Sequence, residues 1–176
     1  LTGQRKVYFL KNPGLDCLND DLPLTHYRFR KENINLLSIP HNEAVMKAYI
    51  FLIYRFPAGQ WVSEWILRIG KKKHVRLPDG LFILEDGTKL AIEVERTHKS
   101  LPELREVVGR FSANFQTGSC QGVLIIAQDS YIFRSLMQRI FHLIPSISGE
   151  YFFVTTFVLL AQDKVFHRDK ELSLNA

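Results

Sequence analysis

Two neighbouring segments in the middle of the chain have the hydrophobic pattern of β-strands. Residues 81–84 are all apolar, Asp86-Gly87 is a turn signal, and in residues 90–95 hydrophobic and polar positions alternate. This pattern predicts a β-hairpin. Because successive strand residues point to opposite faces, its second strand would have one wholly apolar face and one face with two carboxylates. The apolar face is Leu90, Ile92 and Val94, and the other is Ala91, Glu93 and Glu95.

The loop length sets how the two strands of this hairpin pair. Phe82 and Leu84 should complete the apolar face, and this requires a loop with an odd number of residues. We therefore expect the three-residue loop Asp86-Gly87-Thr88, with the glycine in the left-handed conformation.

With that loop, Leu81 would lie opposite Glu93 and Asp79 opposite Glu95, so three carboxylates would share one face. Opposed Cβ atoms are roughly 4.5–5.5 Å apart, which is close enough for one small cation to be held between the acids. Oxygen ligands of this kind suit Mg²⁺ or Mn²⁺. The alternative is that Asp79 belongs to an ordinary turn and the glutamates to a half-exposed strand.

The remaining pattern predicts an α/β protein with a mixed central sheet flanked by helices. The expected elements are a helix over 43–56, a strand over 61–69, a helix after the capping box Ser100/Glu103, a strand over 122–127, a helix from Asp129 or Ser130 to about His142, and a strand over 151–161. In the helix after Ser100, one face is Leu104, Val107, Val108, Phe111 and Phe115, with Arg105 and Arg110 on the other side.

Composition limits the class of protein. The chain has 176 residues, 46% of them hydrophobic and 23% charged, enough for one full core plus an appendage. No apolar run is long enough to cross a bilayer, and no signal peptide is evident, so we expect a cytoplasmic protein with no membrane partner. Cys17 and Cys120 have no metal or redox spacing, which favours reduced thiols.

The net charge of +5 favours an anionic partner, and its distribution is uneven. A basic segment precedes Asp79, where its side chains could hold a DNA phosphate beside the metal. A solvated loop is the alternative. The basic residues proposed to contact nucleic acid are Arg68, Lys71, Lys72, Lys73 and Arg76, with His74 among them.

Two further acids are weaker candidates for metal ligands. Glu43 falls in the first turn of the first expected helix, where a favourable helix-dipole position is the alternative. Glu64 would share a strand face with Val62 and Ile66. The histidines, including His41, His74 and His98, have no zinc spacing, and we do not expect any of them to be a ligand.

Pro78-Asp79, the hairpin and Glu93-Val94-Glu95 together resemble the PD-(D/E)xK nuclease superfamily. The resemblance implies a restriction-endonuclease-like αβββαβ core, a Mg²⁺ or Mn²⁺ ion held by the acids, and hydrolysis of DNA phosphodiesters. The family's lysine is replaced here by Glu95, and Lys99, expected on the following helix, would take its role. Catalytic residues would then be Asp79, Glu93, Glu95 and Lys99.

A narrower resemblance is to plasmid replication-relaxation and mobilisation accessory proteins, in which such a core follows a winged helix. Residues 3–10 and Pro13-Gly14-Leu15 resemble a wing strand and a closing helix. This implies a winged-helix remnant plus linker over 1–40, the nuclease-like domain over 41–162 and a polar tail over 163–176 that frays. Because the first residue is Leu, we expect a fragment, and the partners implied are double-stranded DNA and a relaxase or other mobile-element protein.

Three classes of function therefore stay open. The first is a metal-dependent endodeoxyribonuclease, and the second is a catalytically silent nuclease fold that binds DNA or docks a protein. The third is a plain α/β interaction module with surface acids.

Overall fold

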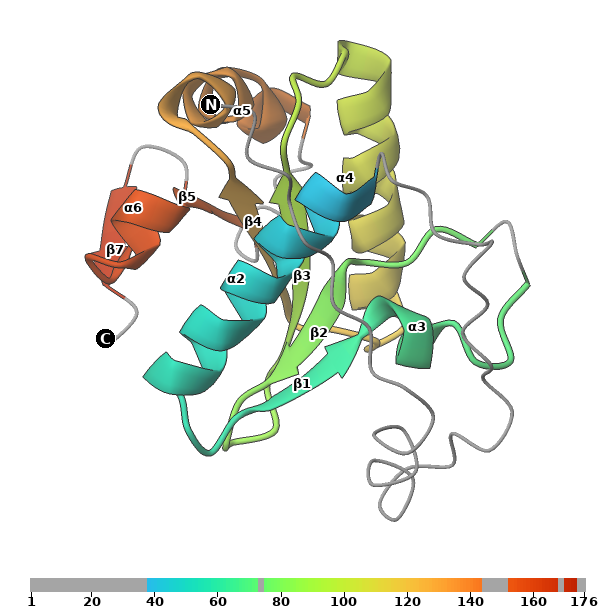
Figure 1. Cartoon of the computed structure of the whole chain (residues 1–176). Coiled ribbons are helices and arrows are strands. Elements are labelled where there is room, and N and C mark those ends of the chain that lie inside the picture. Colours follow the sequence, from blue (N-terminus) through green and yellow to red (C-terminus); the bar gives the residue numbers. More distant parts are fainter. Residues whose placement is uncertain (1–37, 73–74, 144–151, 168–169, 174–176) are drawn as a thin grey trace. The chain divides into compact units, whose positions relative to one another are not determined.

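A computed structural model describes residues 38–72, 75–143, 152–167 and 170–173. In these residues the strands form one mixed sheet in the order β1-β2-β3-β4-β5-β6-β7 (Figure 1). In chain order the elements are α2 (Ile39–Arg55), β1 (Gln60–Ser63), α3 (Glu64–Leu67), β2 (Gly80–Ile83), β3 (Lys89–Glu95), α4 (Leu101–Gln116), β4 (Gly122–Ala127), α5 (Ser130–Leu143), β5 (Phe152–Thr156), α6 (Phe157–Leu160), β6 (Lys164–His167) and β7 (Lys170–Ser173). The β3-β4 and β4-β5 pairs are parallel and the others antiparallel, so the predicted α/β class with a mixed sheet is confirmed.

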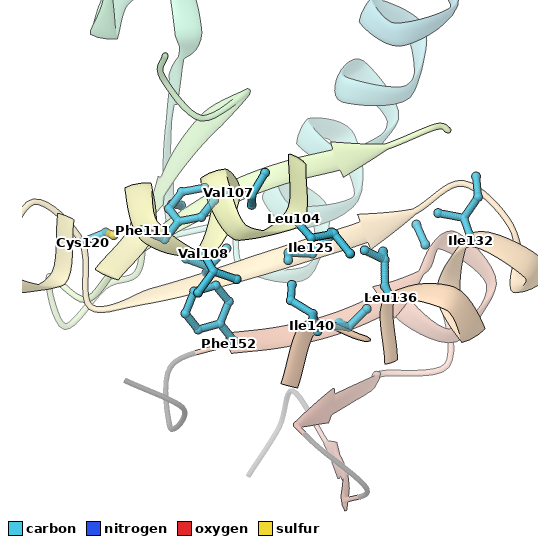
Figure 2. Close-up of a cluster of buried hydrophobic side chains, with 14 residues drawn as sticks. Leu104, Val107, Val108, Phe111, Cys120, Ile125, Ile132, Leu136, Ile140 and Phe152 are labelled. Carbon is cyan, nitrogen blue, oxygen red and sulfur yellow. The ribbon is translucent and has the colours of Figure 1, made fainter. Parts of the chain in front are cut away.

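Helices cover both faces of the sheet, and each face has its own core. On one face, α4 and α5 pack against β4 and β5 through buried side chains that include Leu104, Phe111, Ile125, Leu136 and Phe152 (Figure 2). On the other face, α2 and α6 pack against the side of β3 that holds Ile92 and Val94. Strand β4 lies between parallel neighbours and is buried along its whole length, as its continuous apolar sequence predicts.

The hairpin has the predicted faces but a different register. Leu81 pairs with Ala91, not with Glu93, and Phe82 pairs with Leu90. The N–H of Leu84 donates to the carbonyl of Thr88, so the three-residue loop is 85–87 and not 86–88. The register has moved by two residues, and a shift of two leaves every side chain on its predicted face.

Three helices begin where the sequence pattern predicted strand or loop. Helix α2 starts at Ile39, four residues before the predicted position, with a proline in its first turn. The strand predicted over 61–69 ends at Ser63, and residues 64–67 form the short helix α3. The strand predicted over 151–161 likewise ends at Thr156, whose hydroxyl accepts the N–H of Leu159 and begins α6.

The end of the described chain belongs to the sheet. Residues after Gln162 were predicted to fray, but among those that the structure describes, 164–167 form β6 and 170–173 form β7. Val165 of β6 is buried in the same core as Leu160. The polar composition of this segment misled the prediction because an edge strand needs few apolar residues.

The caps predicted for the two long helices on one face are confirmed. The Ser100 hydroxyl accepts the N–H of Glu103, and the Glu103 carboxylate accepts the N–H of Ser100, which is a complete capping box for α4. The carboxylate of Asp129 accepts the N–H of Ile132 at 2.9 Å at the start of α5. These caps fix where each helix leaves the sheet, and therefore where the loop 96–100 lies.

Residues 37–176 form one compact unit, and most of the predicted wing and linker over 1–40 lies outside the described residues. Among the helices that the structure describes, none has the length and apolar character required to cross a bilayer.

Candidate functional site

Asp79 lies immediately before β2 and is held by β3 and by the first helix. Its Oδ2 accepts the backbone N–H of Val94 at 2.7 Å, which anchors the carboxylate near the C-terminal end of β3. Its Oδ1 lies 2.9 Å from His41 Nε2, on the first turn of α2. The hydrogen bond with Asp79 raises the pKa of His41 above its ordinary value, and the charges of Asp79 and Glu93 act in the same direction against burial.

Glu93 is the most perturbed acid in the site. Its side chain is 12% exposed and its Oε1 accepts a hydrogen bond from Arg110 of α4 at 3.0 Å. Its Oε2 is buried and has no hydrogen-bond partner among the described residues. Burial raises the pKa of Glu93 to about 7, because the Arg110 guanidinium only partly offsets burial and the negative charges of Asp79 and Glu95 add to it.

Glu95, at the end of β3, is buried and pairs with Lys99, whose Nζ lies 3.1 Å from its Oε1. Burial raises the pKa of Glu95, whereas Lys99 opposes that rise. Lys99 was expected on the following helix, but it lies in the loop before α4, because Ser100 is the helix cap. From that loop its ammonium reaches back to the sheet.

The three acids thus lie on one face of the hairpin, and each has a cationic partner. Asp79 pairs with His41, Glu93 with Arg110, and Glu95 with Lys99. Asp79 raises the pKa of both glutamates, so the acids are close enough to interact electrostatically. These basic side chains reduce the electrostatic repulsion among the three partly buried carboxylates.

The carboxylates of Asp79, Glu93 and Glu95 are suitable ligands for a divalent cation, but their present positions do not form a binding site. Carboxylate oxygens are the ligands Mg²⁺ and Mn²⁺ prefer, and the partnerless Oε2 of Glu93 is an acceptor that a cation would satisfy. However, in the part of the chain that is described, no three His, Cys, Asp or Glu side chains are grouped closely enough to hold a metal ion. Binding would require the acids to turn from their cationic partners toward one another.

The two weaker ligand candidates lie elsewhere. Glu43 is exposed and, because α2 begins at Ile39, it is beyond the first turn and lacks the predicted dipole position. Glu64 is not on a strand: it begins α3 and forms an ion pair with Arg68 one turn later. Neither residue therefore has the placement that the sequence predicted for it.

The basic segment is partly neutralised by nearby carboxylates. Arg68 pairs with Glu64 and also donates to the carbonyl of Val75 at 3.1 Å, while Arg76 pairs with Glu106 at 3.1 Å. The other members differ in status: Lys71 and Lys72 are exposed, and Lys73 and His74 lie outside the described residues. A cavity of about 280 Å³, lined in part by Lys71, Arg76, Leu81 and Ala91, separates this segment from the sheet. The predicted phosphate contacts stay a prediction.

Two residues of the site were missed by sequence reasoning. Arg110 was placed on the outer side of its helix, but its side chain is 16% exposed and reaches Glu93. Arg110 immediately precedes the buried Phe111, and its guanidinium carbon lies 4.5 Å from the centre of the Phe111 ring. His41 was set aside for lack of zinc spacing. No local sequence pattern pointed to either contact, because Arg110 is 17 residues from Glu93 and His41 is 38 residues from Asp79.

Comparison of the chain with protein-family models finds no match, and comparisons with curated proteins and with solved structures find none either. The site is therefore interpreted from its own chemistry.

Proposed function

We propose that residues 37–176 form a nuclease-like domain that hydrolyses DNA phosphodiesters with the help of Mg²⁺ or Mn²⁺. The observation that carries the proposal is the acid face of the hairpin, where Asp79, Glu93 and Glu95 lie together and Glu93 has a buried, partnerless oxygen. A buried carboxylate with a pKa near 7 is costly to maintain, and such groups concentrate at functional sites.

The order of the elements also supports this proposal. Apart from the short helix α3 between β1 and β2, helix α2, strands β1, β2 and β3, helix α4 and strand β4 follow one another as in an αβββαβ core, with an antiparallel meander and then a parallel strand. The acids come from β3 and from the residue that precedes β2. This is the arrangement that the PD-(D/E)xK resemblance implies. The plasmid type of DNA and a relaxase partner are proposed from the narrower resemblance alone.

In this mechanism Asp79 and Glu93, with Glu95 adjoining, would hold the cation, which would polarise the scissile phosphate and acidify a bound water. The chain's own residues supply the rest. Lys99 stands within ion-pair distance of Glu95 and would stabilise charge that develops on the phosphate once Glu95 turns away. His41 adjoins Asp79 and, through its hydrogen bond at Nε2, would orient that carboxylate toward the cation.

A catalytically silent DNA-binding or docking module is the second candidate, and one observation favours it. Each of the three acids already pairs with a basic side chain, His41, Arg110 or Lys99, so part of the negative charge of the cluster is offset without a metal ion. In this second function the ion pairs would be structural, and the positive charge of the chain would serve DNA binding alone.

Nicking of supercoiled plasmid in Mn²⁺ tests the first candidate. We expect the unaltered protein to nick the plasmid, EDTA to stop it, and Asp79→Asn combined with Glu93→Gln to abolish it. Glu85→Gln is the matched control, because Glu85 is an exposed carboxylate in the hairpin turn. Activity in the double variant equal to that of the control would sink the nuclease assignment, since it would identify a contaminating enzyme.

Calorimetric titration of the same proteins with Mn²⁺ separates the two candidates. Uptake of Mn²⁺ that is lost in the double variant and kept in Glu85→Gln supports the metal site. Absence of uptake together with salt-sensitive binding to duplex DNA selects the silent module.

A further inference from the structure

Next to the acid cluster, on the loop 96–100 and on α5, is a pair of exposed aromatic rings. The rings of His98 and Tyr131 lie 6.1 Å apart between centroids, with 37° between their planes. His98 is exposed, and Tyr131 is 71% exposed although it lies on a helix whose other face is fully packed. The ring pair therefore presents an aromatic surface to solvent, and stability of the fold does not require Tyr131 to be there.

The position of His98 is fixed by α5. Its Nε2 lies 2.6 Å from the hydroxyl of Ser135 and 3.1 Å from the guanidinium of Arg139. Arg139 also donates to the carbonyl of Lys99 at 2.8 Å, which ties the loop to the helix. Tyr131, Ser135 and Arg139 are four residues apart, so they form one row along α5. The adjacent row on the same helix is buried and consists of Ile132, Leu136 and Ile140 (Figure 2).

This row joins the acid cluster directly. His98 contacts the row, and the next residue, Lys99, contacts Glu95 through its ammonium. Lys99 links the two, because its carbonyl accepts a hydrogen bond from Arg139 and its ammonium pairs with Glu95. Positive charge surrounds it, because Arg139 lies in the row, Arg134 is exposed one turn after Tyr131, and Arg96 lies in the loop.

We propose that His98, Tyr131, Ser135 and Arg139 form a platform that binds an unpaired nucleotide of single-stranded DNA beside the acid cluster. A base would stack on the exposed ring of Tyr131, and a neighbouring phosphate of the same strand would contact the guanidinium of Arg139. Bases within a continuous duplex cannot reach such a ring, because their faces are covered by neighbouring bases. The inference deepens the proposed function: it rests on the acid cluster being a DNA-processing site and assigns its substrate to DNA with an unpaired segment.

Fluorescence anisotropy with a short labelled oligothymidylate in EDTA tests this without requiring cleavage. We expect Tyr131→Ala to weaken binding about tenfold, since stacking on one aromatic ring contributes roughly 1–3 kcal/mol per base. Tyr131→Phe should bind as the unaltered protein does, because the ring is kept. Tyr54→Ala is the matched control: Tyr54 is 86% exposed but belongs to α2, which packs on the opposite face of the sheet. Binding of a blunt duplex should be the same in all four proteins.

Equal oligothymidylate affinities for Tyr131→Ala and Tyr54→Ala would overturn the platform, as would a loss in Tyr131→Phe as large as that in Tyr131→Ala. The two proposals fail separately. A protein that binds single strands through Tyr131 but never cleaves DNA retains the platform and loses the nuclease. A protein that nicks DNA with Tyr131 replaced by Ala and shows no change in single-strand affinity retains the nuclease and loses the platform.

Discussion

Replacing Glu93 by Gln should stabilise the protein at high pH while leaving its stability at low pH nearly unchanged. The amide has the shape of the carboxyl and can still accept a hydrogen bond from Arg110, which now binds Glu93 Oε1 at 3.0 Å. It cannot ionise. The variant therefore mimics the protonated form of Glu93 at every pH.

The magnitude follows from the pKa of Glu93, which burial raises from an ordinary 4.5 to about 7. Between these two values the unfolded chain has lost the proton and the folded chain still holds it, so folded-state stability falls as pH rises through this window. Each pH unit is worth about 1.4 kcal/mol, and the whole window costs about 3 kcal/mol. This loss of folding stability is complete above the folded-state pKa of Glu93 and absent below pH 4.5.

Urea unfolding followed by tryptophan fluorescence at pH 5 and pH 8 measures this difference, since Trp61 and Trp65 both lie in the described domain. The free energies of unfolding of Glu93→Gln and of the unaltered protein should differ by less than about 1 kcal/mol at pH 5, which is only half a unit into this window. At pH 8 the variant should be more stable by about 2 to 3 kcal/mol. Glu85→Gln, with an exposed carboxylate replaced, should follow the unaltered protein at both pH values.

Parallel pH profiles for Glu93→Gln and the unaltered protein would refute this reasoning. They would mean that the carboxylate of Glu93 ionises in the folded state as easily as in the unfolded chain. A lower stability of Glu93→Gln at pH 8 would be more damaging still, because it would show that the ion pair with Arg110 outweighs burial.

Two other predictions concern buried positions. Gly80→Ala should lower the free energy of unfolding by about 1–3 kcal/mol in urea titrations, because overpacking follows when an added methyl meets the Trp61 ring. The added Cβ would come within 2.2 Å of that ring, and an unchanged midpoint would show that the ring moves aside freely. The Cys120 thiol, whose pKa is raised to about 11 by burial, should react slowly with DTNB at pH 8 in a Cys17→Ser background and rapidly in urea. Fast reaction of the folded protein would contradict its burial.

The sequence predicted the faces of the hairpin better than its register. Alternation in β3 decides which side chains share a face, and a shift by two residues cannot change that. It does change the partners, so Asp79 is not opposite Glu95 as predicted. A three-residue loop at 85–87 and one at 86–88 put the same side chains on each face. Only the hydrogen bond between Leu84 and Thr88 distinguishes the two loops.

The cations of the site were harder to predict because they come from distant elements. His41 is 38 residues before Asp79, and its contact depends on where α2 begins relative to the sheet. Arg110 is 17 residues after Glu93 and is drawn inward by that buried acid, against the polar pattern of its helix. Local periodicity cannot supply either contact. Lys99 was found because it is only four residues from Glu95.

The strands at the far end of the sheet have a consequence for how the protein can be shortened. The outer edge of β5 is covered by β6, and β7 then presents Lys170 and Glu171 to solvent, with Glu171 paired to Lys164 at 3.0 Å. Charges on an outermost strand discourage other molecules from adding to it. Truncation after Gln162 would remove β6 and β7, including the buried Val165. The edge of β5 would then be exposed, and the protein would be prone to aggregate.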